Sequence, residues 1–361
     1  MTVEIKREGW LQLFSQMRSP NPFLSRMFTI KPGGIYNGEK VAIDVERFGE
    51  DVAIAIKKCT GPNLNDISEF TTKEFTPPAY GEAFPLDVCD LLNRMAGVDP
   101  YTAAYTEYAG QMVALMAKGF TQIDDKIKRA VELQASQILQ TGKLTLTNSA
   151  GDTVYDLDFK PKATHFPTVG VDWDNAAATP LADLEALAKV IRGDGKVNPD
   201  RVIMGDVALR NFLANTKVQE VLDNNRIDVG SIAPEFNDSG ATFYGFVWIG
   251  SYRMEIWTYP DTYKDPQTGL PVEYVAGDKV IMLSSRTRLD MTSARVPLPL
   301  GPDPRVAGLL PGRMSSREES FDVTPNVYST PNGKQIMGEL ESRPLLIPVQ
   351  IDGFGCLDTQ A

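Results

Sequence analysis

The feature that most constrains the fold of this chain is a long helical pattern between Thr102 and Gln140. Apolar side chains recur there at the spacing of one helix face, and Gly142 stands where such a helix would end. From about Lys118 onward, a continuous helix would span roughly 22 residues and roughly 33 Å, since each residue adds about 1.5 Å. A helix of that length can serve as the backbone of a flat subunit. Its other face is expected to meet solvent or neighbouring molecules and holds Asp124, Asp125, Lys128, Glu132 and Gln137.

Alternating apolar residues predict a pair of strands on each side of this helix in the sequence. Before it, residues 41–45 and 52–56 are separated by a turn-like segment, which is typical of a long β-hairpin. After it, residues 144–146 and 154–157 flank the sequence Asn148-Ser149-Ala150-Gly151, which favours a tight turn.

Residues 170–300 predict a compact α/β unit, because helical and strand patterns alternate there. Thr179 and Pro180 mark the start of an amphipathic helix that Gly193 would end. A second helix is predicted at 207–223, so we expect a sheet flanked by helices. Its strands are predicted at residues 201–204, 243–249, 253–259 and 279–284.

Two long stretches, 60–101 and 296–333, show little periodicity and are rich in proline. Stretches of this length without regular structure are uncommon inside a compact domain and are usually functional when present. Near the N-terminus, a short helix over 8–17 is predicted to lead into an extended arm. The arm has apolar residues that need burial, Phe23, Leu24, Met27 and Phe28, and the chain is predicted to end with an apolar strand at 343–351.

Composition restricts the class of function. The chain has 361 residues and a net charge of -11, from 36 basic and 47 acidic side chains, which argues against holding nucleic acid through a basic surface. The three cysteines, Cys59, Cys89 and Cys356, are odd in number and form no C-x-x-C pair, so neither a disulfide framework nor a zinc site is expected. The sequence shows no signal peptide and no membrane-spanning run, and we expect a protein that is cytoplasmic when made.

The sequence contains no recognisable motif for catalysis or cofactor binding. The single histidine, His165, has no second histidine with which to hold a metal, and a loop or half-buried position is expected. The glycine cluster at 193–196 follows a helix rather than opening one, so we interpret it as a helix-ending loop. Asp124 and Asp125 would point about 100° apart on a helix and are expected on a solvated face. We therefore assign no catalytic, cofactor-binding or metal-binding residue.

Several short segments of the chain match a known family in their order and spacing. The segments are Asn21–Phe28, Glu39–Asp44, Cys59–Gly61, Glu69–Thr71, Phe75–Pro77, Ile138–Lys143, Asp156–Phe159, Pro180–Leu184 and Ser342–Pro348. Taken together, they resemble the lambda-type major capsid proteins of tailed phages, the phage major capsid protein E family. The resemblance covers nearly the whole chain.

The resemblance implies an α+β fold, the tailed-phage major capsid fold, with a defined order of regions. An N-terminal arm (1–38) would precede an extended β-hairpin loop (39–101) and a peripheral domain with a long spine helix (102–169). A compact α/β apical domain (170–300) would follow. Residues 301–361 would then return to the peripheral domain and supply a C-terminal strand.

The resemblance also implies a structural protein and no enzyme. Such proteins self-assemble into hexamers and pentamers of an icosahedral phage head that encloses double-stranded DNA, which is not bound sequence-specifically. No cofactor and no membrane contact is expected, and portal, scaffold or decoration proteins of the same phage would be the partners. The expected location is the virion, assembled in the host cytoplasm. Alternatives are an encapsulin-like shell around cargo enzymes, an enzyme with a site in the middle α/β unit, and a tail or decoration protein.

Two groups of residues are candidates for contacts between subunits. Aromatic rings on the extended loop would have no local core to enter, so Phe70, Phe75 and Tyr80 are expected to lie against an adjacent subunit. In the second irregular stretch, charges of alternating sign suit ion pairs across a subunit border. These charges are Arg305, Arg313, Arg317, Glu318 and Glu319, with Asp303 and Asp322 close by in the sequence.

Overall fold

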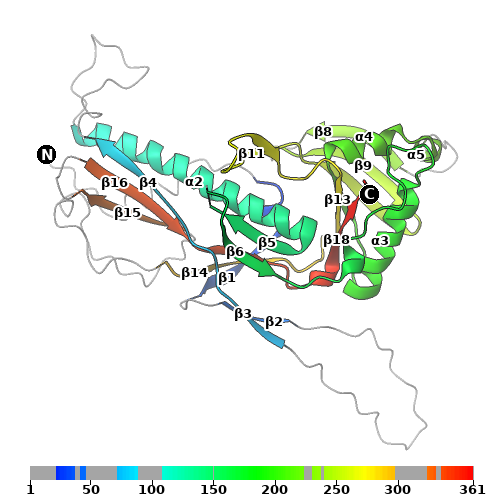
Figure 1. Cartoon of the computed structure of the whole chain (residues 1–361), viewed down its shortest axis with the longest axis horizontal. Coiled ribbons are helices and arrows are strands. Elements are labelled where there is room, and N and C mark those ends of the chain that lie inside the picture. Colours follow the sequence, from blue (N-terminus) through cyan, green and yellow to red (C-terminus); the bar gives the residue numbers. More distant parts are fainter. Residues whose placement is uncertain are drawn as a thin grey trace, which may run out of the picture.

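The computed structural model describes residues 22–36, 41–45, 71–87, 108–148, 150–222, 230–236, 240–296, 323–330 and 335–360. Figure 1 shows an elongated part, built along helix α2 (Tyr108–Thr141), and a compact part at one end of it. Some predicted features lie outside the described residues: the helix at 8–17, the strand at 52–56, Phe70, and the charged residues from Asp303 to Asp322.

Helix α2 is a single helix of 34 residues, about 51 Å long at 1.5 Å per residue. It ends where the sequence predicts, because Gly142 adopts a left-handed backbone with a φ of 66°. The Gly142 N–H donates a hydrogen bond of 2.8 Å to the carbonyl of Ile138, which satisfies one of the last free carbonyls of the helix. The predicted spine helix is confirmed, and it is longer than the pattern from Lys118 onward suggested.

The prediction that the polar face of α2 meets solvent or neighbours is wrong for two of its residues. Asp124 is 4% exposed and forms an ion pair with Lys128, and Glu132 is 2% exposed. The reason is that α2 is covered on more than one side, by a sheet along its first half and by residues 23–25 of the N-terminal arm near Glu132. The spacing of apolar residues within one helix cannot predict that a distant part of the chain will pack against its polar face.

A three-stranded sheet packs against α2 in the order β15 (Val323–Ser329), β16 (Gln335–Ser342), β4 (Tyr80–Asp87). The core between them includes Phe120 and Ile123 of the helix and Leu340 of the sheet. β4 and β15 lie inside the two stretches predicted to be irregular, so that prediction is wrong for these strands. The prediction failed because proline is rare in strands. Pro85 and Pro325 both lie in edge strands, where the absence of a backbone N–H donor costs little stability.

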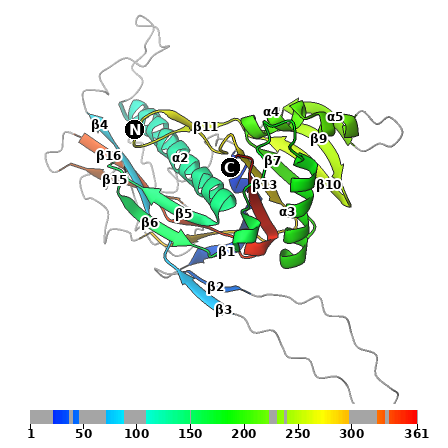
Figure 2. The same cartoon turned by 45° about the vertical axis from the view of Figure 1, so that its right-hand side comes forward.

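The extended loop begins with two paired strands. β2 (Val41–Val45) is antiparallel to β3 (Thr71–Phe75), so its described partner is a strand inside the first stretch predicted to be irregular. Figures 1 and 2 both show β2 and β3 projecting from the body near β1 (Thr29–Tyr36). The strand pair predicted after α2 is confirmed as β5 (Lys143–Thr147) and β6 (Thr153–Asp158). The side-chain oxygen of Asn148 closes the turn by accepting hydrogen bonds from the backbone N–H groups of Ala150 and Asp152.

The compact part contains the predicted sheet flanked by helices. Its six strands follow the order β18, β13, β7, β10, β9, β8, and one face is covered by α3 (Pro180–Gly195) and α4 (Asp206–Ala214). The helix predicted at 207–223 is two helices, because Asn215 interrupts it and its side chain caps α5 (Thr216–Leu222) through the N–H of Lys217. The strands are β7 (Arg201–Met204), β8 (Gly230–Phe236), β9 (Thr242–Ile249), β10 (Tyr252–Thr258), β13 (Lys279–Leu283) and β18 (Phe354–Asp358).

Strands from both ends of the described chain join the two parts. β18, the last strand, is antiparallel to β13 in the sheet of the compact part. β1 is parallel to β14 (Asp290–Ala294), which pairs on its other side with β17 (Pro344–Ile347). The predicted terminal strand at 343–351 is therefore β17, followed by the short helix η4 (Ile351–Gly353). The domain bounds stay a prediction.

Two glycines at the end of α3 provide a matched test of the packing between α3 and η4. A Cβ at Gly195 would lie 2.2 Å from the backbone oxygen of Asp352, whereas a Cβ at Gly193 would meet nothing within 4 Å. We expect Gly195→Ala to lower the free energy of unfolding by about 1–3 kcal/mol through overpacking. Gly193→Ala is expected to raise it by about 0.5–1 kcal/mol, because alanine favours a helix. Urea denaturation of the two variants checks both signs, and equal effects would contradict the close packing at Gly195.

Candidate assembly surfaces

The N-terminal arm is attached to α2 by one buried carboxylate. The backbone N–H groups of Phe23, Leu24 and Ser25 donate to the two oxygens of Glu132 over 3.0, 2.6 and 2.9 Å. Within the described part of the chain, no lysine or arginine forms an ion pair with Glu132. Three N–H donors therefore stabilise its charge, and they hold residues 23–25 of the arm against α2.

Aromatic rings complete this attachment. The ring of Phe23 lies 5.5 Å from Trp257 and 5.4 Å from Tyr259, so the arm contacts the compact part as well as α2. Burial, together with the nearby Glu132 charge, raises the pKa of the Tyr259 phenol, which stays protonated at all ordinary pH values. The expected burial of the arm is confirmed for Phe23, Leu24 and Phe28, and Met27 packs beside them.

Two of the three candidate aromatic residues of the loop, Phe75 and Tyr80, contact other parts of their own chain. Phe75 is 8% exposed and its ring lies 5.7 Å from Phe159. The hydroxyl of Tyr80 accepts a hydrogen bond of 2.7 Å from Gln134, and burial raises the pKa of Tyr80 to about 12. The reasoning that these rings have no local core to enter is therefore wrong for Phe75, which is part of a core, and for Tyr80, which packs against the core between α2 and its sheet. That the rings contact another subunit stays a prediction.

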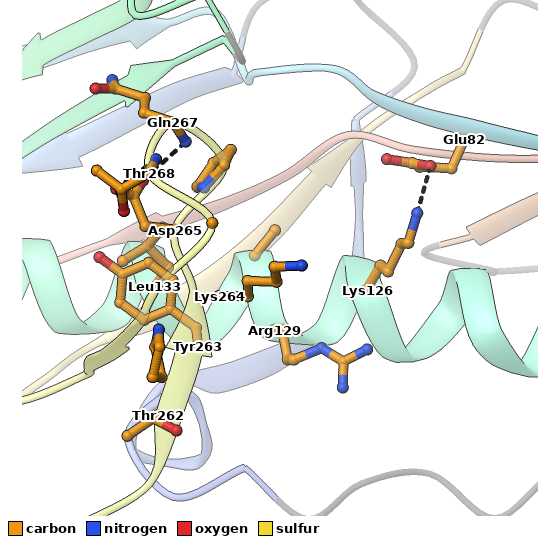
Figure 3. Close-up of a pocket in the computed structure, with 14 residues that line it drawn as sticks. Glu82, Lys126, Arg129, Leu133, Thr262, Tyr263, Lys264, Asp265, Gln267 and Thr268 are labelled. Atoms are coloured by element: carbon orange, nitrogen blue, oxygen red, sulfur yellow. Dashed lines mark hydrogen bonds and ion pairs between the residues drawn. The ribbon is translucent and has the colours of Figure 1, made fainter.

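A groove runs between α2 and the hairpin of β11 (Thr262–Lys264) and β12 (Pro271–Glu273), with a volume of about 1010 Å³ (Figure 3). We call it the α2 groove. Its helix side is one stripe, with the charged side chains of Lys126 and Arg129 beside the apolar Leu133. Its other walls are Glu82, from β4, and the hairpin residues 262–269 and Pro271. No sequence pattern predicted this groove, because its walls are far apart in the chain and the hairpin has no motif.

The charged side chains that line the α2 groove differ in whether they have a partner. Lys126 forms an ion pair of 3.1 Å with Glu82. Asp265 turns into its own loop, where hydrogen bonds from the Thr268 hydroxyl and the Gln267 N–H lower the pKa of its carboxyl group. Among the residues that the structure describes, Arg129 and Lys264 have no carboxylate partner, and Figure 3 draws no interaction to either.

A second cavity, of about 390 Å³, lies on the opposite side of α2. Ile127 and Val131 of the helix line it together with Phe28, Met291 and Val323. Ile30, which also lines it, is 69% exposed. Both sides of α2 thus offer surface that a partner could cover.

The histidine, glycines and cysteine that the sequence analysis considered for chemistry occupy positions where they contribute to packing or to the end of a helix. His165 lies in the short helix η3 (Ala163–His165) and is buried rather than half-buried, with Nδ1 2.9 Å from the Phe354 carbonyl and Nε2 3.2 Å from Asp194. Gly193 and Gly195 belong to the last turn of α3, and Lys196 ends it with a φ of 57°.

Cys356 is buried, which raises its pKa to about 12. In the described ranges, no group of three His, Cys, Asp or Glu side chains could hold a metal ion, and no helix could span a membrane.

Comparison with known structures shows the fold. The putative capsid protein of a prophage from E. coli CFT073 aligns over 99% of this chain and 99% of its own, with a TM-score of 0.66 and 14% identity. A phage-related protein from Bordetella bronchiseptica RB50 aligns over 96% and 94%, with a TM-score of 0.50 and 11% identity. The SrpI encapsulin of Synechococcus elongatus PCC 7942 aligns over 98% and 95%, at a TM-score of 0.43 and 12% identity, which is too low to support an argument. The predicted α+β capsid fold is confirmed.

The family follows from the sequence. None of the curated proteins compared with the chain matches it. The model of one family, described as phage major capsid protein E, matches residues 11–354, which is nearly the whole chain. That match favours a phage capsid over the alternative of an encapsulin-like shell. The chain belongs to the phage major capsid protein E family, and it is a structural protein of a phage capsid.

Proposed function

We propose that this protein assembles into the hexamers and pentamers of an icosahedral phage head that encloses double-stranded DNA. The proposal rests on the family match over residues 11–354. The shape of the subunit agrees with it, because an elongated body with a strand pair projecting from it offers long contacts to neighbours (Figure 1). The protein would act by assembly and not by catalysis.

The partners and location follow from the same proposal. Copies of the chain would assemble in the host cytoplasm with portal, scaffold or decoration proteins of the same phage, and would end in the virion. With a net charge of -11 per subunit, the shell would hold the packaged DNA weakly and without sequence preference. The predicted contacts between subunits are Phe70, Phe75 and Tyr80 on the loop, and Arg305, Arg313, Arg317, Glu318 and Glu319 in the segment between β14 and β15.

A loop deletion tests the proposal without disturbing the body of the subunit. Residues 46–70 are replaced by Asn-Gly, which can join β2 to β3 because Val45 and Thr71 are paired in the ladder. Phe75 and Tyr80 stay in place. We expect a folded subunit with an unchanged far-ultraviolet circular dichroism spectrum that no longer forms closed shells in electron micrographs, whereas the full chain does. Closed shells from the deletion variant, or only monomers of the full chain in native mass spectrometry, would contradict the proposal.

A further inference from the structure

The α2 groove has positive charge that no carboxylate of the described residues neutralises. Arg129 lines it from the helix and Lys264 from the hairpin, and neither has a carboxylate partner in the described ranges (Figure 3). Of the three cations that line the groove, Lys126 alone has a carboxylate partner within the part of the chain that the structure describes, namely Glu82. In a chain with eleven more acidic than basic side chains, two unmatched cations at one groove indicate a negatively charged ligand.

The floor of the groove indicates what kind of anion would fit. Ala130 and Leu133 of α2, together with Tyr263 and the prolines Pro266 and Pro271 of the hairpin, give it a largely apolar lining. Phosphates of a DNA duplex gain from cations alone and have no use for an apolar floor. A peptide that carries carboxylates beside an apolar anchor satisfies both parts of the surface.

The chain itself contains such a peptide. Residues 318–322 read Glu-Glu-Ser-Phe-Asp, which places three carboxylates around the single aromatic anchor Phe321. We propose that the α2 groove of one subunit binds residues 318–322 of a neighbouring copy, with Glu318 and Glu319 at Arg129 and Lys264. This inference rests on the proposed function, and it gives the predicted charged contacts a definite place.

The length of the connection favours a neighbouring copy over the same chain. Residue 323 begins β15 and lines the cavity on the other side of α2, with Ile127 and Val131. At about 100° per residue, that stripe lies nearly half a turn from the stripe of the groove, so a chain passing around the helix would need roughly 16–19 Å at its surface. Four residue steps from Glu319 to Val323 provide only about 14 Å when fully extended.

Charge reversal with rescue tests the pairing. We expect Arg129→Glu with Lys264→Glu to lower the yield of closed shells about tenfold, and Glu318→Lys with Glu319→Lys to do the same, because like charges would then face each other. All four changes together are expected to restore the yield to within about twofold of the unchanged chain. Arg286→Glu is the matched control, since Arg286 is an exposed cation after β13 that does not line the groove and forms no ion pair with a described carboxylate, and it is expected to leave the yield unchanged.

A cross-link tests the position independently of shell yield. In a chain with Cys59→Ser and Cys89→Ser, buried Cys356 does not compete, so Lys264→Cys and Glu319→Cys can be placed on separate chains of different mass. We expect a disulfide between the two masses after mild oxidation. A bond formed only when both cysteines lie on one chain would overturn the assignment to a neighbour.

The outcomes separate this inference from the proposed function. If the unchanged chain forms no shells, the proposed function fails. If it forms shells, but both double reversals leave the yield unaffected and the cross-link does not form, only the groove assignment fails. Shells that form normally but lose DNA from the Arg129→Glu and Lys264→Glu variant would show that the groove faces nucleic acid, which would also overturn the inference. Circular dichroism of each variant before assembly verifies that it is folded.

Discussion

Replacing Glu132 with alanine is expected to lower the free energy of unfolding by about 3–6 kcal/mol, a large effect for one side chain. Three backbone N–H groups, those of Phe23, Leu24 and Ser25, would lose their acceptor in a buried place. Each buried donor left without an acceptor costs about 1–3 kcal/mol. The midpoint of urea denaturation of the unassembled subunit measures the loss.

A second glutamate provides the control for Glu132. Glu185 also lies on a helix, but it is partly exposed and pairs with Lys189 one turn away at 2.7 Å, so Glu185→Ala is expected to cost no more than about 0.5 kcal/mol. Proteolysis can detect whether the Glu132→Ala change releases the arm locally. Arg26 is exposed and lies next to the three donors, so trypsin is expected to cleave there faster in Glu132→Ala than in Glu185→Ala. Equal losses of stability in the two variants would contradict the role of Glu132.

Replacing Gly119 with alanine is expected to lower the free energy of unfolding by about 1–3 kcal/mol, although alanine is the better helix former. The ring of Phe84 causes this, because it lies between two glycines. A Cβ at Gly119 of α2 would come within 2.4 Å of the ring, and a Cβ at Gly338 of β16 within 2.5 Å. Phe84 also meets Phe120 edge to face at 5.4 Å, so the ring cannot move away freely.

A double-mutant cycle checks this arrangement, because the effect of Gly119→Ala on the free energy of unfolding is expected to change sign when Phe84 is removed. In a chain with Phe84→Ala, the space beside Gly119 is open, and Gly119→Ala is then expected to raise the free energy of unfolding by about 0.5–1 kcal/mol. Thermal or urea denaturation of the four chains gives the coupling between the two sites. An effect of Gly119→Ala with the same sign and size in both backgrounds would refute the close packing of the ring.

The elements that the sequence predicts well are those whose signal is local. Helix α2 ends at Gly142 as expected, and the turn at Asn148 and the strands of the compact part have patterns that depend only on near neighbours. The edge strands β4 and β15 were not predictable, because Pro85 and Pro325 oppose a strand assignment until the sheet order shows which edge they occupy.

The assembly surfaces depend on contacts between distant residues, which explains why they were only partly predictable. Glu132 accepts hydrogen bonds from residues more than a hundred positions earlier, so a helical pattern alone placed it on the wrong face. The α2 groove combines Lys126 and Arg129 with a hairpin that begins at Thr262. Its proposed acidic ligand, in contrast, is already suggested by the charge pattern around Glu318 in the sequence.

The pairing of β18 with β13 closes the large sheet late in folding. Until residues 354–358 reach it, the β13 edge of that sheet is open, and β14 has one open edge until β17 pairs with it. Long-range pairing of this kind forms slowly. An open strand edge can accept a strand from another chain, so refolding at high protein concentration is expected to produce aggregates that refolding of dilute chains avoids.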